Sequence, residues 1–105
     1  MKNGFEVLFD YSSQNFEWDA AKNIKNMEKH GVDFEYAINV FLNPILLKND
    51  ERNDYGEERF IALGLVYGVA IFVVFTNRPG DTMRIISAWR GGVRAKRIYC
   101  AALME

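Results

Sequence analysis

The chain has 105 residues and a formal net charge of −1, from 13 Lys and Arg against 14 Asp and Glu. This length fits one domain, residues 1–105, and half of the residues are hydrophobic, as in ordinary globular proteins. One His and one Cys cannot supply a Cys₂His₂ or His₃ zinc site, and no apolar run is long enough to span a bilayer. Because the N-terminus has no basic-then-apolar signal peptide, we expect a small soluble cytoplasmic protein.

The near-zero charge argues against a nucleic-acid partner until its distribution is considered. Residues 1–58 carry a net charge of −6, and residues 59–105 carry +5. Six of the seven basic residues in the second half are arginines, whose planar fork suits phosphate. Two interpretations stay open: a solvated basic face, or an electrostatic footprint for a phosphate polymer.

The first 15 residues predict either a short hairpin or a loose extension. Apolar side chains recur at every second position within residues 5–9 and again within residues 16–18, a spacing typical of strands. Turn-forming residues at 10–13 lie between the two runs.

Two helices are expected next. Asp19 is a suitable N-cap for the first helix, and Gly31 suits the residue that ends it. Ile24 and Met27 lie on the face that we expect to be buried, with lysines on the other face. Asp33 is a suitable N-cap for the second helix. That helix has an amphipathic stripe ended by Asn43–Pro44: Phe34, Ala37, Ile38, Phe41 and Leu42.

The rest of the chain predicts a sheet and a final helix. A polar loop over residues 48–57 separates a first strand from three further strands with short connections, at 45–47, 59–63, 69–75 and 83–88. Helical spacing of apolar residues over 95–102 predicts a C-terminal helix. The fold class is therefore α+β, with two N-terminal helices, an antiparallel meander of three to four strands, and a C-terminal helix.

In such a meander, Arg59 and Arg84 open strands that run the same way, so both lie at one end of the sheet. Strands two apart are about 10 Å from each other, which suits a grip on one phosphate or on two neighbouring phosphates. The alternative is that Arg59 pairs with Glu57 or Glu58 and that Arg84 caps a sheet edge.

Trp89 and Arg90, at the opposite end of the third strand, form a candidate platform for stacking an RNA base. Arg94 and Arg97 share a helix face and extend this into a basic ridge. The alternative for Trp89 is ordinary packing.

His30 is the default acid–base candidate, because it alone has an unperturbed pKa near neutrality. The alternative is a histidine that interacts with the C-terminal dipole of its helix. Five carboxylates lie between Asp50 and Glu58. They are expected to be a solvated loop, and no metal site or cofactor is expected.

Several segments in order resemble the BrnT-type toxins. The resemblance covers most of the chain, from about residue 16 to Tyr99, and is carried by Phe16–Asp19, Lys22, Asn26, Lys29–Val32, Phe34, Val40–Pro44, Gly56–Phe60, Leu63–Gly64, Val73–Thr76, Arg84–Ala88 and Arg90. Residues 16–104 then form the toxin-like core, and residues 1–15 extend beyond the usual start.

The resemblance implies a type II toxin with a fold similar to RelE-like ribonucleases, which cleaves RNA and inhibits translation. It also implies a DNA-binding antitoxin of the BrnA type that neutralises the toxin, in a complex of possible higher order. Members usually carry another Arg where this chain has Trp89, and often a Glu where it has Ala95.

The resemblance and the residues agree on metal-independent cleavage, in which the RNA 2′-OH attacks its own phosphate. In this hypothesis Arg59 and Arg84 hold the scissile phosphate, and His30 or a carboxylate such as Glu58 moves protons. Arg90, Trp89, Arg94 and Arg97 contact the rest of the RNA. The alternative is a weak or inactive relative that acts as an RNA- or protein-binding module, an interpretation favoured by Trp89 and Ala95.

Overall fold

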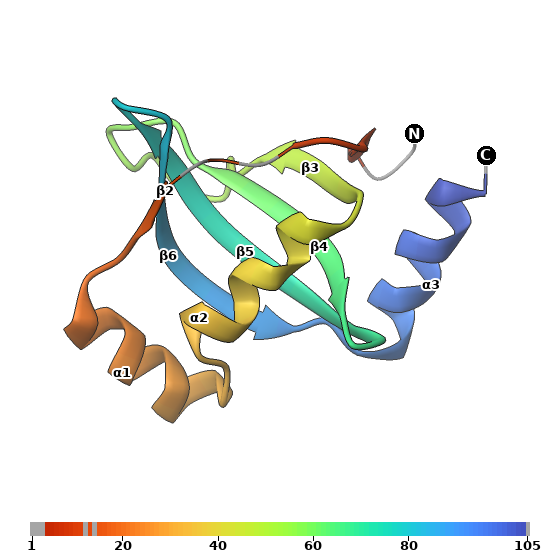
Figure 1. Ribbon diagram of the computed structural model, residues 1–105, viewed down its shortest axis with the longest axis horizontal. Helices are drawn as coiled ribbons and strands as arrows, with labels where there is room; N and C mark the ends of the chain where they lie inside the picture. The colour runs from red at the N-terminus through yellow and green to blue at the C-terminus, as the bar shows by residue number, and fades with distance from the viewer. Residues whose placement is uncertain (1–3, 12, 14, 105) are drawn as a thin grey trace.

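The computed structural model describes residues 4–11, 13 and 15–104 (Figure 1). Its six strands form one sheet in the order β1-β3-β4-β5-β6-β2, with bounds β1 Glu6–Leu8, β2 Asn15–Glu17, β3 Ile45–Asn49, β4 Phe60–Val66, β5 Val69–Arg78 and β6 Thr82–Arg90. The helices are α1 Ala20–His30, α2 Phe34–Ala37, the 3₁₀ helix η1 Ile38–Leu42, and α3 Gly92–Leu103. None of the helices in the described part is long and apolar enough to cross a membrane.

Strands β3 to β6 form the predicted antiparallel meander. The turn between β4 and β5 is tight because Tyr67 and Gly68 both have positive φ angles, of 48° and 78°, which match the right-handed twist of the flanking strands. The pairing of β5 with β6 contains one irregularity: Val74 pairs with Ser87, whereas Phe75 pairs with Ile85, so β6 has one extra residue there.

The predicted N-terminal hairpin is wrong. Strand β1 pairs antiparallel with β3, and β2 pairs parallel with β6, so the two segments lie at opposite edges of the sheet. A four-stranded meander leaves two edges with unpaired backbone groups, and each segment pairs with one of them. The sheet is therefore larger than predicted and mixed. Ser12, in the predicted turn, lies outside the described residues.

One face of the sheet, which we call the α2 face, is covered by α2 and η1 (Figure 1). Its core includes Phe34, Val40, Ala62 and Phe75, all with no exposed surface. Gly64 lets η1 approach closely, since a Cβ there would lie 2.8 Å from the Val40 Cβ.

The second helix is shorter than predicted. Asp33 caps α2 as expected, but the chain then continues as the 3₁₀ helix η1. The tighter winding moves Leu42 off the apolar stripe, and its side chain is 79% exposed.

Helix α1 has the predicted ends, with Asp19 accepting from the Ala21 amide and Gly31 at a φ of 68°. Its predicted buried face is wrong, because Ile24 and Met27 are 59% and 45% exposed.

The face of α1 that packs on the sheet carries Asn26, which is buried. The Asn26 amide donates to the Ala88 carbonyl and accepts from the Ala88 N–H, at 2.8 and 3.2 Å. Strand β2 pairs with β6 only as far as Arg84. The Asn26 side chain thus satisfies backbone groups of β6 that have no neighbouring strand.

The opposite face of the sheet, the α3 face, is covered by helix α3 at one end only (Figure 1). Its apolar core is formed by Phe5, Leu46, Leu63, Ala70, Ala95, Tyr99 and Ala102, with Phe72 packed against it. The other end of this face meets the β3–β4 loop, residues 50–59.

Candidate functional site

A row of polar residues crosses the end of the α3 face that helix α3 leaves uncovered. Thr76 pairs with Arg84 across β5 and β6, and Arg84 pairs with Glu17 across β6 and β2. On the other side, the pairing of Phe60 with Phe75 places Arg59 beside Thr76. The Asp50 amide donates to the Arg59 carbonyl at 2.8 Å, which continues the ladder to β3. Because the side chains of directly paired residues share a face, these residues form one cross-sheet row.

Arg84 is held in place by β2, the strand that was predicted to belong to an N-terminal hairpin and instead pairs with β6. Its Nη1 donates to the Glu17 carboxylate at 2.8 Å, and both side chains are partly exposed, at 38% and 43%. Sequence reasoning missed Glu17 as a site residue, because nothing local in residues 15–17 indicates a parallel partner 67 positions away.

Arg59 lies two strands from Arg84, about 10 Å away by strand spacing. Its Nε donates to Glu57 at 3.0 Å, and its guanidinium lies 4.0 Å from the centre of the Tyr55 ring. Arg59 therefore pairs with Glu57 in the free protein, as one of the two predictions for this residue expected. Glu58 instead accepts from the Asn49 amide at 3.4 Å, and its carbonyl accepts from the Thr76 hydroxyl.

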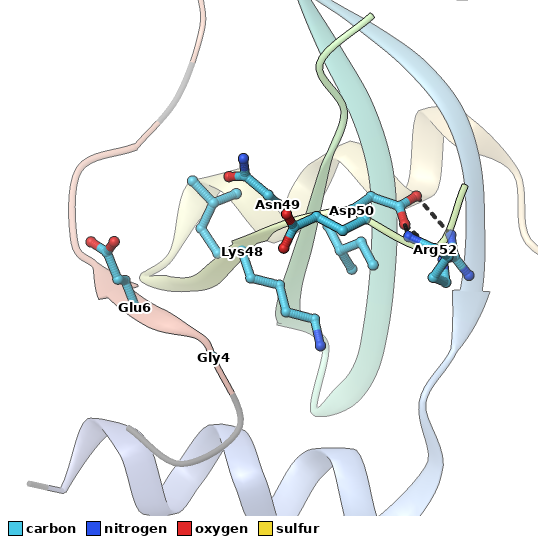
Figure 2. Close-up of a pocket in the computed structure, with 9 residues that line it drawn as sticks. Gly4, Glu6, Lys48, Asn49, Asp50 and Arg52 are labelled. Atoms are coloured by element: carbon cyan, nitrogen blue, oxygen red, sulfur yellow. Dashed lines mark hydrogen bonds and ion pairs between the residues drawn. The ribbon is translucent and has the colours of Figure 1, made fainter. Parts of the chain in front are cut away.

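The β3–β4 loop is not simply the solvated acidic loop that was expected. The Asp50 side chain has no exposed surface, and it accepts two hydrogen bonds from the Arg52 guanidinium, at 2.8 and 2.9 Å, one from the Arg52 backbone N–H and one from the Tyr55 hydroxyl. Figure 2 shows Asp50 directed at Arg52, while Glu6 points away from the pair. The hydrogen bonds from Arg52 lower the pKa of Asp50 from 3.8 to about 2.

Beside this pair lies an open pocket of about 600 Å³, lined among others by Lys48, Arg52 and Ile61. The Lys48 ammonium lies 4.5 Å from the centre of the Phe5 ring. Within the described residues no three His, Cys, Asp or Glu side chains come together as a metal site would need.

Trp89 lies on the same face as Arg84, since its partner across β5 is Phe72 of the α3-face core. The Trp89 ring stacks on Phe72 with centroids 5.4 Å apart, and the Arg52 guanidinium lies 5.4 Å from the Trp89 ring. The His30 ring is 6.1 Å away. The Trp89 ring, which was predicted to stack an RNA base, is thus already in contact with Arg52, and the sequence did not indicate this contact.

The remaining predicted RNA contacts do not gather around Trp89. Arg90 pairs with Ile71 of the α2-face core, so it lies on the opposite face of the sheet from Trp89. Arg94 and Arg97 are exposed on α3. They form no hydrogen bond or ion pair with other residues in the described part of the chain.

His30 belongs to a second basic area. Three lysines of α1 line an open pocket of about 220 Å³ with His30 and the edge of β6: Lys22, Lys25 and Lys29, beside Ile86 and Ser87. Trp89 lies five positions along β6 from Arg84, which is about 15 Å, and the His30 ring lies beside Trp89. The structure therefore forms two groups, Arg59 with Glu58 and Arg84, and His30 with Trp89 and Arg52.

Comparison with known proteins adds two findings. The sequence model of a family described as the ribonuclease toxin, BrnT, of type II toxin–antitoxin system matches residues 18–91. The crystal structure of the Brucella abortus ribonuclease toxin BrnT has a similar fold, with a TM-score of 0.52 and 24% identity, over 75% of this chain and 97% of that one. A comparison with curated protein sequences gives no significant match.

Proposed function

Since this chain belongs to the BrnT family of ribonuclease toxins from type II toxin–antitoxin systems, we propose that it is a cytoplasmic endoribonuclease that cleaves RNA without a metal ion. The observation that carries the proposal is the cross-sheet row. Arg59 and Arg84 lie on either side of Thr76, at the end of the sheet face that α3 leaves uncovered. This arrangement suits a phosphate that bridges two strands.

In the proposed reaction the RNA 2′-OH attacks the adjacent phosphorus and the bond to the 5′-oxygen breaks. The products are a 2′,3′-cyclic phosphate and a 5′-OH. Negative charge grows on the phosphate oxygens in the transition state, and Arg59 and Arg84 stabilise it. The proton of the 2′-OH passes to a carboxylate, either Glu17, which is paired with Arg84, or Glu58, which precedes Arg59 in the chain. The protonated carboxylate then returns this proton to the leaving 5′-oxygen, because His30, the candidate expected from the sequence, lies beside Trp89 and not beside Arg84.

Both arginines are paired with carboxylates in the free protein, Arg84 with Glu17 and Arg59 with Glu57. An RNA phosphate exchanges places with these carboxylates as it binds. Each phosphate contact also releases counterions, so binding weakens steeply with added salt although the total charge is near zero.

We also propose a neutralising partner, an antitoxin similar to BrnA. The support is the family itself, because a type II toxin is paired with a protein antitoxin. Purification of the toxin co-expressed with such an antitoxin tests this: a stable complex that lacks RNA cleavage supports the proposal, and separate elution of the two proteins contradicts it.

The test of the catalytic proposal is RNA digestion in the presence of EDTA with wild type, Arg84→Ala and Lys96→Ala. Arg84→Ala removes a charge that stabilises the transition state, so we expect cleavage to fall by about 10²- to 10³-fold. Lys96 lies beside the β4–β5 turn, at the other end of the sheet, and its replacement removes the same charge with wild-type activity retained. Thermal unfolding checks that both variants fold.

Cleavage by Arg84→Ala at the wild-type rate would contradict the role of Arg84. A second candidate function, an inactive binding module, is favoured by the Trp89 ring, which already contacts Phe72 and Arg52. It predicts RNA binding without cleavage by the wild type and no growth arrest when the protein is expressed alone.

A further inference from the structure

Arg52 is held in a defined orientation between Asp50 and Trp89. Its Nε and one Nη donate to the two oxygens of Asp50, which fixes the plane of the guanidinium. Its carbon centre Cζ lies 5.4 Å from the Trp89 ring, within the range of a cation–π contact. Even so, 54% of the Arg52 side chain remains exposed.

The residues around Arg52 are themselves held in place. Asp50 accepts a further hydrogen bond from the Tyr55 hydroxyl at 3.1 Å, and its side chain is fully buried. The Trp89 ring is stacked on Phe72, which packs against the α3-face core. Since both supports are fixed, Arg52 has given up much of its rotamer freedom before any ligand arrives, and binding to it costs less entropy.

The exposed side of this guanidinium offers a flat, positively charged surface. Two of its five N–H groups donate to Asp50. Guanidinium planes and aromatic rings are the surfaces on which unpaired RNA bases stack. The open pocket that Arg52 lines with Lys48 and Ile61 leaves room beside it.

We propose that Arg52, supported by Trp89, forms a nucleobase subsite on which one unpaired base of the RNA stacks. This inference rests on the proposed function, because it takes RNA as the ligand of the α3 face. The subsite lies about 15 Å along β6 from Arg84. It therefore holds a base that is near the cleaved position in the strand but not next to it, and it sets the register of the strand. Trp89 acts through Arg52 and does not itself face the base.

The test separates a base contact from a phosphate contact. A 2′-O-methyl oligonucleotide has no free 2′-OH, so its binding is measured without cleavage. A matched oligonucleotide with abasic sites keeps the phosphates and removes the bases. Trp18→Phe leaves Trp89 as the only indole, since the chain has two tryptophans. Trp89 fluorescence then reports on the subsite directly.

We expect Arg52→Ala to weaken binding of the normal oligonucleotide roughly 10-fold, and Arg52→Lys to weaken it nearly as much, because lysine keeps the charge but not the plane. The abasic oligonucleotide should bind wild type and Arg52→Ala equally well. Thermal unfolding of each variant confirms that the β3–β4 loop change leaves the fold intact.

Three results would overturn the subsite: wild-type affinity in Arg52→Lys, equal wild-type affinity for normal and abasic oligonucleotides, or a loss on Arg52→Ala that affects only binding of the antitoxin. Failure of the catalytic proposal looks different. If the wild type binds the normal oligonucleotide more tightly than the abasic one but does not cleave RNA, the subsite is supported and the proposed ribonuclease activity is contradicted.

Discussion

The two faces of the sheet are covered very differently. On the α2 face, helices close over a continuous apolar core in which Phe34, Val40 and Phe75 have no exposed surface. On the α3 face the apolar core ends part of the way along, and paired charges take its place, with Arg52 on Asp50 and Arg84 on Glu17. The closed face accounts for the stability of the fold, and the partly open face keeps charged groups where a ligand can reach them.

This division predicts that the largest losses of stability come from the α2 face. Phe34→Ala removes a fully buried ring that packs edge-on against Trp18. We expect the free energy of unfolding to fall by about 3–5 kcal/mol. Urea denaturation measures this change, and a loss below about 1 kcal/mol would show that the α2 face is not the main core.

A smaller effect is expected on the α3 face, and it depends on pH. The pKa of Asp50 is about 2 in the folded protein against 3.8 as the ordinary value. Because folding lowers this pKa, the pair stabilises the protein above pH 3.8, by about 2 kcal/mol, and this contribution is lost as the pH falls towards 2. The unfolding free energies of wild type and Asp50→Asn should therefore differ at pH 6 and converge near pH 2. A difference that does not change with pH would contradict the assignment.

The smallest effect is expected on the exposed side of α1. Ile24→Ala should change the free energy of unfolding by no more than about 0.5 kcal/mol, since its side chain is already in solvent. Asn26→Ala on the same helix leaves buried backbone groups of Ala88 unpaired and should cost about 1–3 kcal/mol. Denaturation of the two variants side by side measures both changes. A larger loss of unfolding free energy in Ile24→Ala than in Asn26→Ala would show that the face predicted from periodicity is the buried one.

Local patterns were enough to predict some parts of the fold. Asp19 and Asp33 were identified as N-caps because capping depends on neighbours in sequence. The meander followed from short connections, and it correctly brought Arg59 and Arg84 to one end of the sheet. The roles assigned to these arginines, and to His30 and Glu58, remain predictions.

Features that depend on distant partners were not predictable. The contact of Glu17 with Arg84 requires a parallel pairing between segments far apart in the chain. The burial of Asn26 was not predicted, because the sequence does not show that the edge of β6 needs a hydrogen-bonding side chain. The stack of Arg52 on Trp89 likewise depends on how the β3–β4 loop crosses the sheet.

The extra residue in β6, opposite the Val74–Phe75 step, has a further consequence. In a regular strand, side chains alternate, so Arg84 would share a face with Arg90 and lie opposite to Trp89. One inserted residue reverses this parity: Arg84 pairs with Thr76 and Trp89 with Phe72, both on the α3 face, while Arg90 pairs with Ile71 on the other. A single extra residue in β6 thus determines whether the groups that we propose to bind phosphate and to stack a base lie on the same face of the sheet.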